Sequence, residues 1–100
     1  MSKERLMVLF FVVCDHVLNE AVCSALDSAG VDRYVKWDKM QGEWSEKHMC
    51  THIWPGEYHA FLAMVPEDNC EILKHAITDI RKEYPADEVW AWRIPLEQTV

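Results

Sequence analysis

Leu6-Met-Val-Leu-Phe-Phe-Val-Val13 is a continuous apolar run near the start of the chain. It is rich in β-branched and aromatic residues and shorter than an ordinary core helix, which favours a strand buried on both faces. It is also far short of the roughly 20 residues that cross a bilayer. We therefore predict a central strand, no membrane insertion, no signal peptide and a cytoplasmic location.

Two helical stripes alternate with further strands. Apolar residues recur at helical spacing from Leu18 to Ala29, with Asp15 as the expected N-cap and Gly30 as the stop. A second stripe precedes Pro85 and consists of Cys70, Leu73, Ile77, Ile80 and Tyr84.

Three more segments have the composition of strands. The stretch from Val31 to Met40 alternates and predicts a half-buried strand, the stretch from Tyr58 to Val65 is mostly apolar, and Val89-Trp-Ala-Trp-Arg-Ile94 is aromatic and β-branched. The order predicts one α+β domain over residues 1–100, with the ferredoxin-like βαββαβ arrangement. Both helices would cover one face of a four-stranded antiparallel sheet.

The other face of that sheet is also expected to be apolar. The first strand shows no alternation, and Trp90 and Trp92 share one face of the last strand. Packing of sheet against sheet between subunits would bury such a surface, so we predict a homo-oligomer.

Charge and cysteine content exclude other classes. The chain carries 17 acidic and 10 basic residues, a net charge of −7, with the basic residues scattered, so nucleic acid is not an expected ligand. Widely spaced cysteines favour reduced thiols over a disulfide framework. The four are Cys14, Cys23, Cys50 and Cys70.

The long connection from Gln41 to Gly56 holds the most suggestive pattern. His48, Cys50 and His52 alternate and would project from one side of extended backbone, and His59 could add a fourth ligand. These residue types suit zinc, copper or nickel. The alternative is an exposed loop that is rich in histidine by chance.

The same connection could contact a ligand or a partner protein. Trp44 and Trp54 bracket it, together with Gln41, Gly42 and Gly56, and tryptophan often anchors binding surfaces. Alternatively, the two tryptophans close a hydrophobic cluster of the loop itself or contact a neighbouring subunit. His16, which follows the first strand, is interpreted as a surface residue.

No catalytic motif is present. The sequence lacks a glycine-rich phosphate loop, GxSxG, HExxH and CxxC. Cys50 has histidines two residues away on each side, but residues two apart on a strand point the same way rather than toward each other. We expect no enzyme, and a small enzyme of the ferredoxin-like or dimeric α+β barrel type is kept as an alternative.

Several segments taken together resemble the P-II-like (PII-like) signalling proteins. They are Gln41-Gly42, Trp54-Pro55-Gly56-Glu57, Met64-Val65-Pro66-Glu67-Asp68 and Ile94-Pro95-Leu96-Glu97, in the same order of elements. The resemblance implies a homotrimer of ferredoxin-like subunits, a loop that reaches partner proteins, and intersubunit clefts that bind small effectors. It implies a regulator rather than an enzyme.

The sequence departs from this family at two places. The segment Glu83-Tyr-Pro-Ala-Asp-Glu88, where nitrogen-regulatory members bind nucleotide phosphates, is acidic and lacks glycine. The loop from Gln41 to Gly56 is shorter than the family's and has no tyrosine. The related CutA-type proteins are associated with divalent metals, so a transition-metal-binding protein is the second hypothesis beside a divergent regulator.

Overall fold

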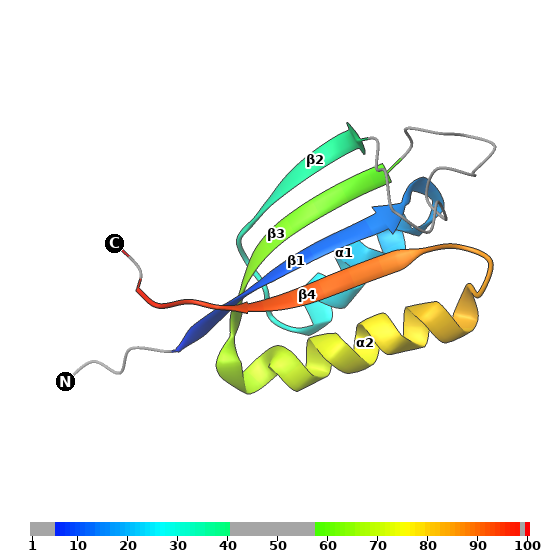
Figure 1. Cartoon of the computed structure of the whole chain (residues 1–100). Coiled ribbons are helices and arrows are strands. Elements are labelled where there is room, and N and C mark those ends of the chain that lie inside the picture. The colour runs from blue at the N-terminus through cyan, green and yellow to red at the C-terminus, as the bar shows by residue number, and fades with distance from the viewer. Residues whose placement is uncertain (1–5, 41–57, 99) are drawn as a thin grey trace.

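The computed structural model describes residues 6–40, 58–98 and 100 (Figure 1). The elements are β1 (Met7–Asp15), the 3₁₀ turn η1 (His16–Leu18), α1 (Asn19–Ser28), β2 (Tyr34–Met40), β3 (Tyr58–Pro66), the 3₁₀ turn η3 (Glu67–Asn69), α2 (Cys70–Glu83) and β4 (Val89–Pro95). Their order is the predicted one, and the α+β ferredoxin-like fold class is confirmed. No helix among these residues is long and apolar enough to span a membrane.

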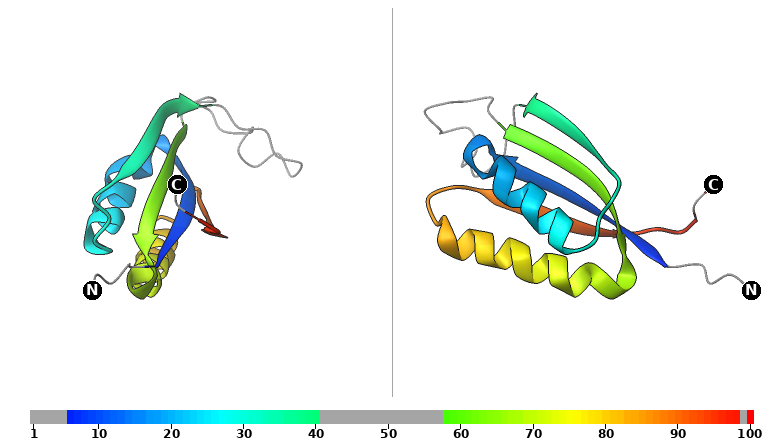
Figure 2. Two further views of the ribbon diagram at one scale, coloured as in Figure 1. Left: turned by 90° about the vertical axis from the view of Figure 1, so that its left-hand side faces the viewer. Right: turned by 180° about the vertical axis from the view of Figure 1, so that it is seen from behind.

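The four strands form one antiparallel sheet in the order β2-β3-β1-β4. The apolar strand β1 lies between β3 and β4, as its sequence predicted. Both helices cover the same face of the sheet, so no helix of the described residues covers the opposite face (Figure 2).

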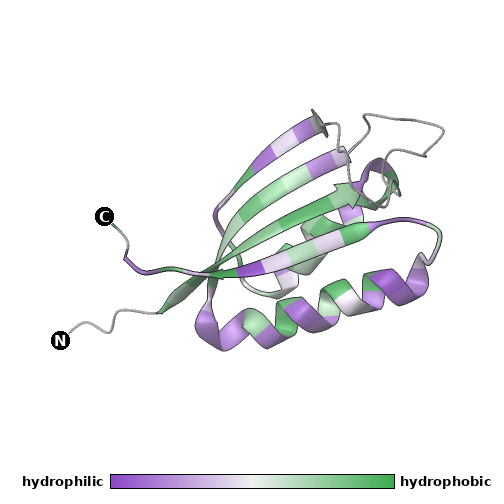
Figure 3. Ribbon diagram, in the orientation of Figure 1, coloured by the Kyte–Doolittle hydropathy of each residue, from purple (hydrophilic) through white to green (hydrophobic). Residues whose placement is uncertain are grey.

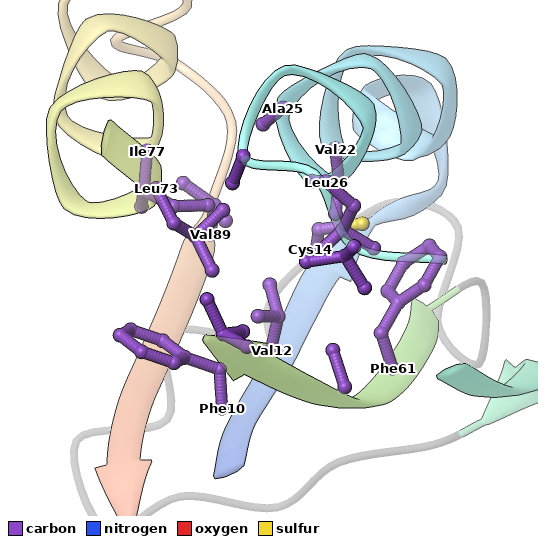
Figure 4. Close-up of a cluster of buried hydrophobic side chains, with 14 of the residues drawn as sticks. Phe10, Val12, Cys14, Val22, Ala25, Leu26, Phe61, Leu73, Ile77 and Val89 are labelled. Atoms are coloured by element: carbon purple, nitrogen blue, oxygen red, sulfur yellow. The ribbon is translucent and has the colours of Figure 1, made fainter. Parts of the chain in front are cut away.

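The core lies between the helices and the sheet face that they cover (Figure 4). Alternate β1 residues from Val8 to Cys14 are buried there, and the register places Phe61 of β3 opposite Val12. Burial is the main reason why the pKa of the Cys14 thiol is raised to about 12. Cys14, Cys23 and Cys70 are free thiols, as predicted, and Cys50 lies outside the described residues.

The ends of the first helical region differ in part from the prediction. The side chain of Asp15 makes no capping hydrogen bond and is buried instead, because the chain passes through η1 before α1 begins. Gly30 does end the helical region, with φ of 73°, a conformation that glycine adopts without strain.

Two burial predictions are wrong. Tyr84 does not continue the buried stripe of α2: the helix ends at Glu83, and the Tyr84 side chain is exposed. Strand β2 starts at Tyr34 rather than Val31, and its residues 34–38 are exposed because it is an edge strand. Val35 and Trp37 face away from the helices, whereas Tyr34 faces Cys23 of α1.

Candidate functional site

Polar and ionisable residues gather at one end of the sheet. Strands β1 and β2 end there and β3 and β4 begin there, because all neighbours in the sheet are antiparallel (Figure 1). The backbone N–H of Asp15 donates to the carbonyl of Glu88 at 2.9 Å, which ties the end of β1 to the residue before β4. Residues 40 and 58, which flank the segment 41–57 in the chain, also lie at this end.

Three side chains at this end form a hydrogen-bonded network. Nδ1 of His59 lies 2.8 Å from Oδ1 of Asp38, and Nε2 of His59 lies 3.2 Å from Nδ1 of His16. His59 is buried, with 7% of its surface exposed, whereas His16 and Asp38 are exposed. A buried imidazole is thus held between an exposed carboxylate and an exposed imidazole.

The ionised Asp38 carboxylate indicates which nitrogens donate and which accept in this network. The bond from His59 is the main cause that lowers the pKa of Asp38, and Lys36, with Nζ 3.4 Å from the same oxygen, lowers it further. The ionised carboxylate can only accept, so Nδ1 of His59 donates. In neutral His59 the other nitrogen, Nε2, is then an acceptor, and Nδ1 of His16 donates to it.

A groove lies at the same end of the sheet, between the end of α2 and the start of β4. Its volume is about 440 Å³, within the size range of small-molecule sites, and it is lined by Arg81, Pro85, Asp87, Glu88, Val89 and Trp90. One carboxylate oxygen of Glu88 is buried without a hydrogen-bond partner among the described residues. Arg81 donates from Nε to the carbonyl of Val89 at 3.2 Å.

The sheet face opposite the helices, here termed the outer sheet face, receives the β1 side chains that alternate with the buried ones. Figure 3 shows that β1 is hydrophobic along most of its length, so this face is apolar at its centre. Phe11 of β1 stacks on Trp92 of β4 with ring centroids 5.7 Å apart, and Trp90 stacks on Trp92 at 6.4 Å. The exposed large side chains of this face are Val35, Trp37, Trp90, Trp92 and Ile94. An exposed apolar surface of this kind is typical of a protein–protein interaction site.

Most of the residues that the sequence singled out lie outside the described part of the chain. These are Gln41, Gly42, Trp44, His48, Cys50, His52, Trp54 and Gly56, and their roles stay predictions. His59, expected as a fourth metal ligand, lies in β3 and pairs with His16 and Asp38. In residues 6–40 and 58–98 no group of three or more His, Cys, Asp or Glu could hold a metal ion.

Sequence reasoning missed the pairing of His16 with His59. The two residues are 43 positions apart, and only the register of β1 on β3, with Cys14 opposite His59, brings them together. The one available signal was that His16 follows the end of a strand.

Comparison with solved structures places this geometry on a known scaffold. CPII, a nitrogen regulatory PII-like protein from Thiomonas intermedia K12, matches with a TM-score of 0.64 and 16% identity over 97% of this chain and 94% of that one. The chain has the PII-like fold. A candidate PII-like signalling protein from Thermus thermophilus matches at 0.61 and 19% identity, over 94% of this chain and 91% of that one.

A DUF3240 family protein from Shewanella baltica matches this chain at a TM-score of 0.61 and 14% identity, over 100% of this chain and 97% of that one. The CPII structure contains ADP, AMP and bicarbonate. No protein-family model matches the sequence, and no curated protein does. The predicted resemblance to PII-like proteins is confirmed at the level of the fold.

Proposed function

We propose that the protein is a PII-like regulator that assembles as a homotrimer and binds a small effector instead of catalysing a reaction. The PII-like fold supports the proposal, since the similar CPII structure holds small ligands. The apolar outer sheet face supports an assembly, because a subunit that left this face in water would risk aggregation. The trimeric state itself rests on the resemblance to the family.

The observation that carries an effector site is the groove, whose wall includes the carboxylate of Glu88 and the ring of Trp90. Glu88 lines the groove, and its carboxylate can accept a hydrogen bond from a ligand N–H or ammonium group there. Trp90 offers an aromatic face on the wall. The groove therefore suits a ligand that combines a ring with an amino group, as an adenine or a similar base does.

Charge in the groove limits how many phosphates the effector carries. Among the lining residues, Asp87 and Glu88 oppose a single cation, Arg81. Each added phosphate meets this acidic wall, so affinity should fall from AMP to ADP to ATP. A site that binds triphosphates would show the opposite order of affinities. The expected order is consistent with the acidic segment from Glu83 to Glu88, at which this sequence departs from the nitrogen-regulatory proteins.

A partner protein would contact the segment from Gln41 to Gly56. The strands that flank this segment in the chain reach the end of the sheet beside the groove, so a bound effector could alter what the segment presents. Trp44 and Trp54 are the residues proposed to anchor that contact.

Calorimetry with adenosine, AMP, ADP, ATP and bicarbonate, together with light scattering on the free protein, tests the proposal. We expect a trimer and the affinity order given above, with Glu88→Gln weakening AMP about tenfold or more because a charge-assisted hydrogen bond is lost. Glu83→Gln, at an exposed acid that does not line the groove, is the matched control. A monomer that gives no heat with any of these ligands would refute both parts.

A further inference from the structure

The two imidazoles at the sheet end face each other through one nitrogen each. Nδ1 of His16, in η1, and Nε2 of His59, in β3, are 3.2 Å apart, and the ring centroids are 5.4 Å apart. We infer that these two nitrogens form a binding site for a divalent transition metal such as zinc, copper or nickel, with Asp38 orienting His59.

The distance between the nitrogens fits metal coordination. Two histidine ligands at the usual Zn–N distance of about 2.05 Å and a tetrahedral angle place their nitrogens about 3.3 Å apart. The observed distance between the two nitrogens is within about 0.1 Å of that value, and it is at the long end of the range for a hydrogen bond. A metal ion between the two nitrogens would take the place of the shared proton.

Asp38 supplies the second feature of a histidine metal site. Histidine ligands usually donate their other N–H to a carboxylate, which fixes the tautomer and makes the ligating nitrogen more basic. The bond from Nδ1 of His59 to Oδ1 of Asp38, at 2.8 Å, does this and leaves Nε2 as the electron-pair donor. Burial of His59 holds the ring, so one of the two ligands is preorganised.

The charges around the pair favour a dication. Asp38 faces His59 from β2, and the buried Asp15 immediately precedes His16, whereas the cation paired with this cluster in the described part of the chain is Lys36. Among the described residues the pair supplies two ligands, so further coordination positions would stay open to water or a ligand. Imidazole ligands suit zinc, copper and nickel better than magnesium or calcium, which prefer oxygen.

This site differs from the one predicted in the loop, and it does not depend on the proposed effector. The test therefore uses the full chain with His48, Cys50 and His52 replaced by alanine, so that only His16 and His59 can provide the paired ligands. Zinc alone is titrated by calorimetry at neutral pH, and copper(II) alone is added for paramagnetic resonance, which reports the number of coordinated nitrogens.

We expect the loop-substituted protein to bind one metal ion, with two nitrogens in the copper spectrum. Adding His16→Ala should abolish this binding; because His16 is exposed, the variant should stay folded, which circular dichroism checks. Asp38→Asn should weaken binding about 10- to 100-fold while keeping both nitrogens. His75→Ala, at an exposed histidine of α2, is the matched control and should change nothing.

Loss of all metal binding on substitution of the loop residues would overturn the inference, and so would binding that survives His16→Ala. Neither result affects the AMP titration or the mass of the assembly. The metal site and the proposed function are therefore tested by different measurements, and either can be wrong without the other.

Discussion

Replacing Trp92 by glutamate should separate the subunits of the assembly. Trp92 lies on the outer sheet face with 37% of its surface exposed in the isolated subunit. A tryptophan side chain buries up to about 250 Å², so roughly 90 Å² per copy remains to be covered by a neighbour. At ~25 cal/mol per Å² this is about 2 kcal/mol per copy, or about 7 kcal/mol for three copies.

That loss alone corresponds to about five orders of magnitude in the association constant of a trimer. A glutamate carboxylate buried without a partner in an apolar interface adds a further penalty of several kcal/mol. We therefore expect the variant to be a monomer at concentrations where the wild type forms the proposed trimer, as measured by light scattering over a dilution series.

The matched control is Ile72→Glu. Ile72 is 46% exposed on α2, so the substitution places the same charge on a similarly exposed apolar residue of the helix layer, away from the outer sheet face. It should leave the mass unchanged. Circular dichroism must show that both variants are folded, since Trp92 also stacks on Phe11. A folded Trp92→Glu variant with the wild-type mass would refute the assignment of this face as the subunit interface.

Three further predictions concern stability. Gly30→Ala should cost about 1 to 2 kcal/mol in urea denaturation, because φ is 73° and the new Cβ would lie 3.0 Å from Nδ2 of Asn69; wild-type stability would contradict the conformational argument. Leu73→Ala, at a fully buried position, should cost about 2 to 5 kcal/mol, whereas Thr78→Ala on the exposed side of the same helix should cost far less. Burial raises the pKa of Cys70 above 9.0, so the stability from its neutral thiol is present below pH 9.0 and is lost as pH rises through the higher folded value. In the Cys70→Ala variant the thermal unfolding temperature should fall less steeply above pH 9.0 than in the wild type. An unchanged pH profile would contradict the burial of this thiol.

The fold was predictable because its strongest patterns are local. The apolar run in β1 has the length and composition of a central strand, and the spacing from Cys70 to Ile80 is that of a single helical face. Burial at the element ends was less predictable. Tyr84 continues the helical spacing, yet the helix ends before it, ahead of Pro85, and its side chain falls outside the core.

The sheet end was not predictable from the sequence in the same way. The contact of His59 with Asp38 depends on the pairing of β2 with β3, and an irregularity of that pairing falls between Trp37 and Met40. Its contact with His16 depends on the separate pairing of β1 with β3. Periodicity within one segment carries no information on either register. The sequence therefore could not predict that His16 and His59 contact each other.

Trp90 links assembly and effector binding in the proposed function. It lies on the outer sheet face beside Trp92, and it also lines the groove with Glu88. A neighbouring subunit that covers the outer sheet face would therefore also approach one wall of the groove, which matches a cleft between subunits. On this reasoning the monomeric Trp92→Glu variant should bind AMP more weakly than the wild type, although Trp92 does not line the groove. The metal site draws on His16, His59 and Asp38 instead, so zinc binding should not depend on the state of assembly.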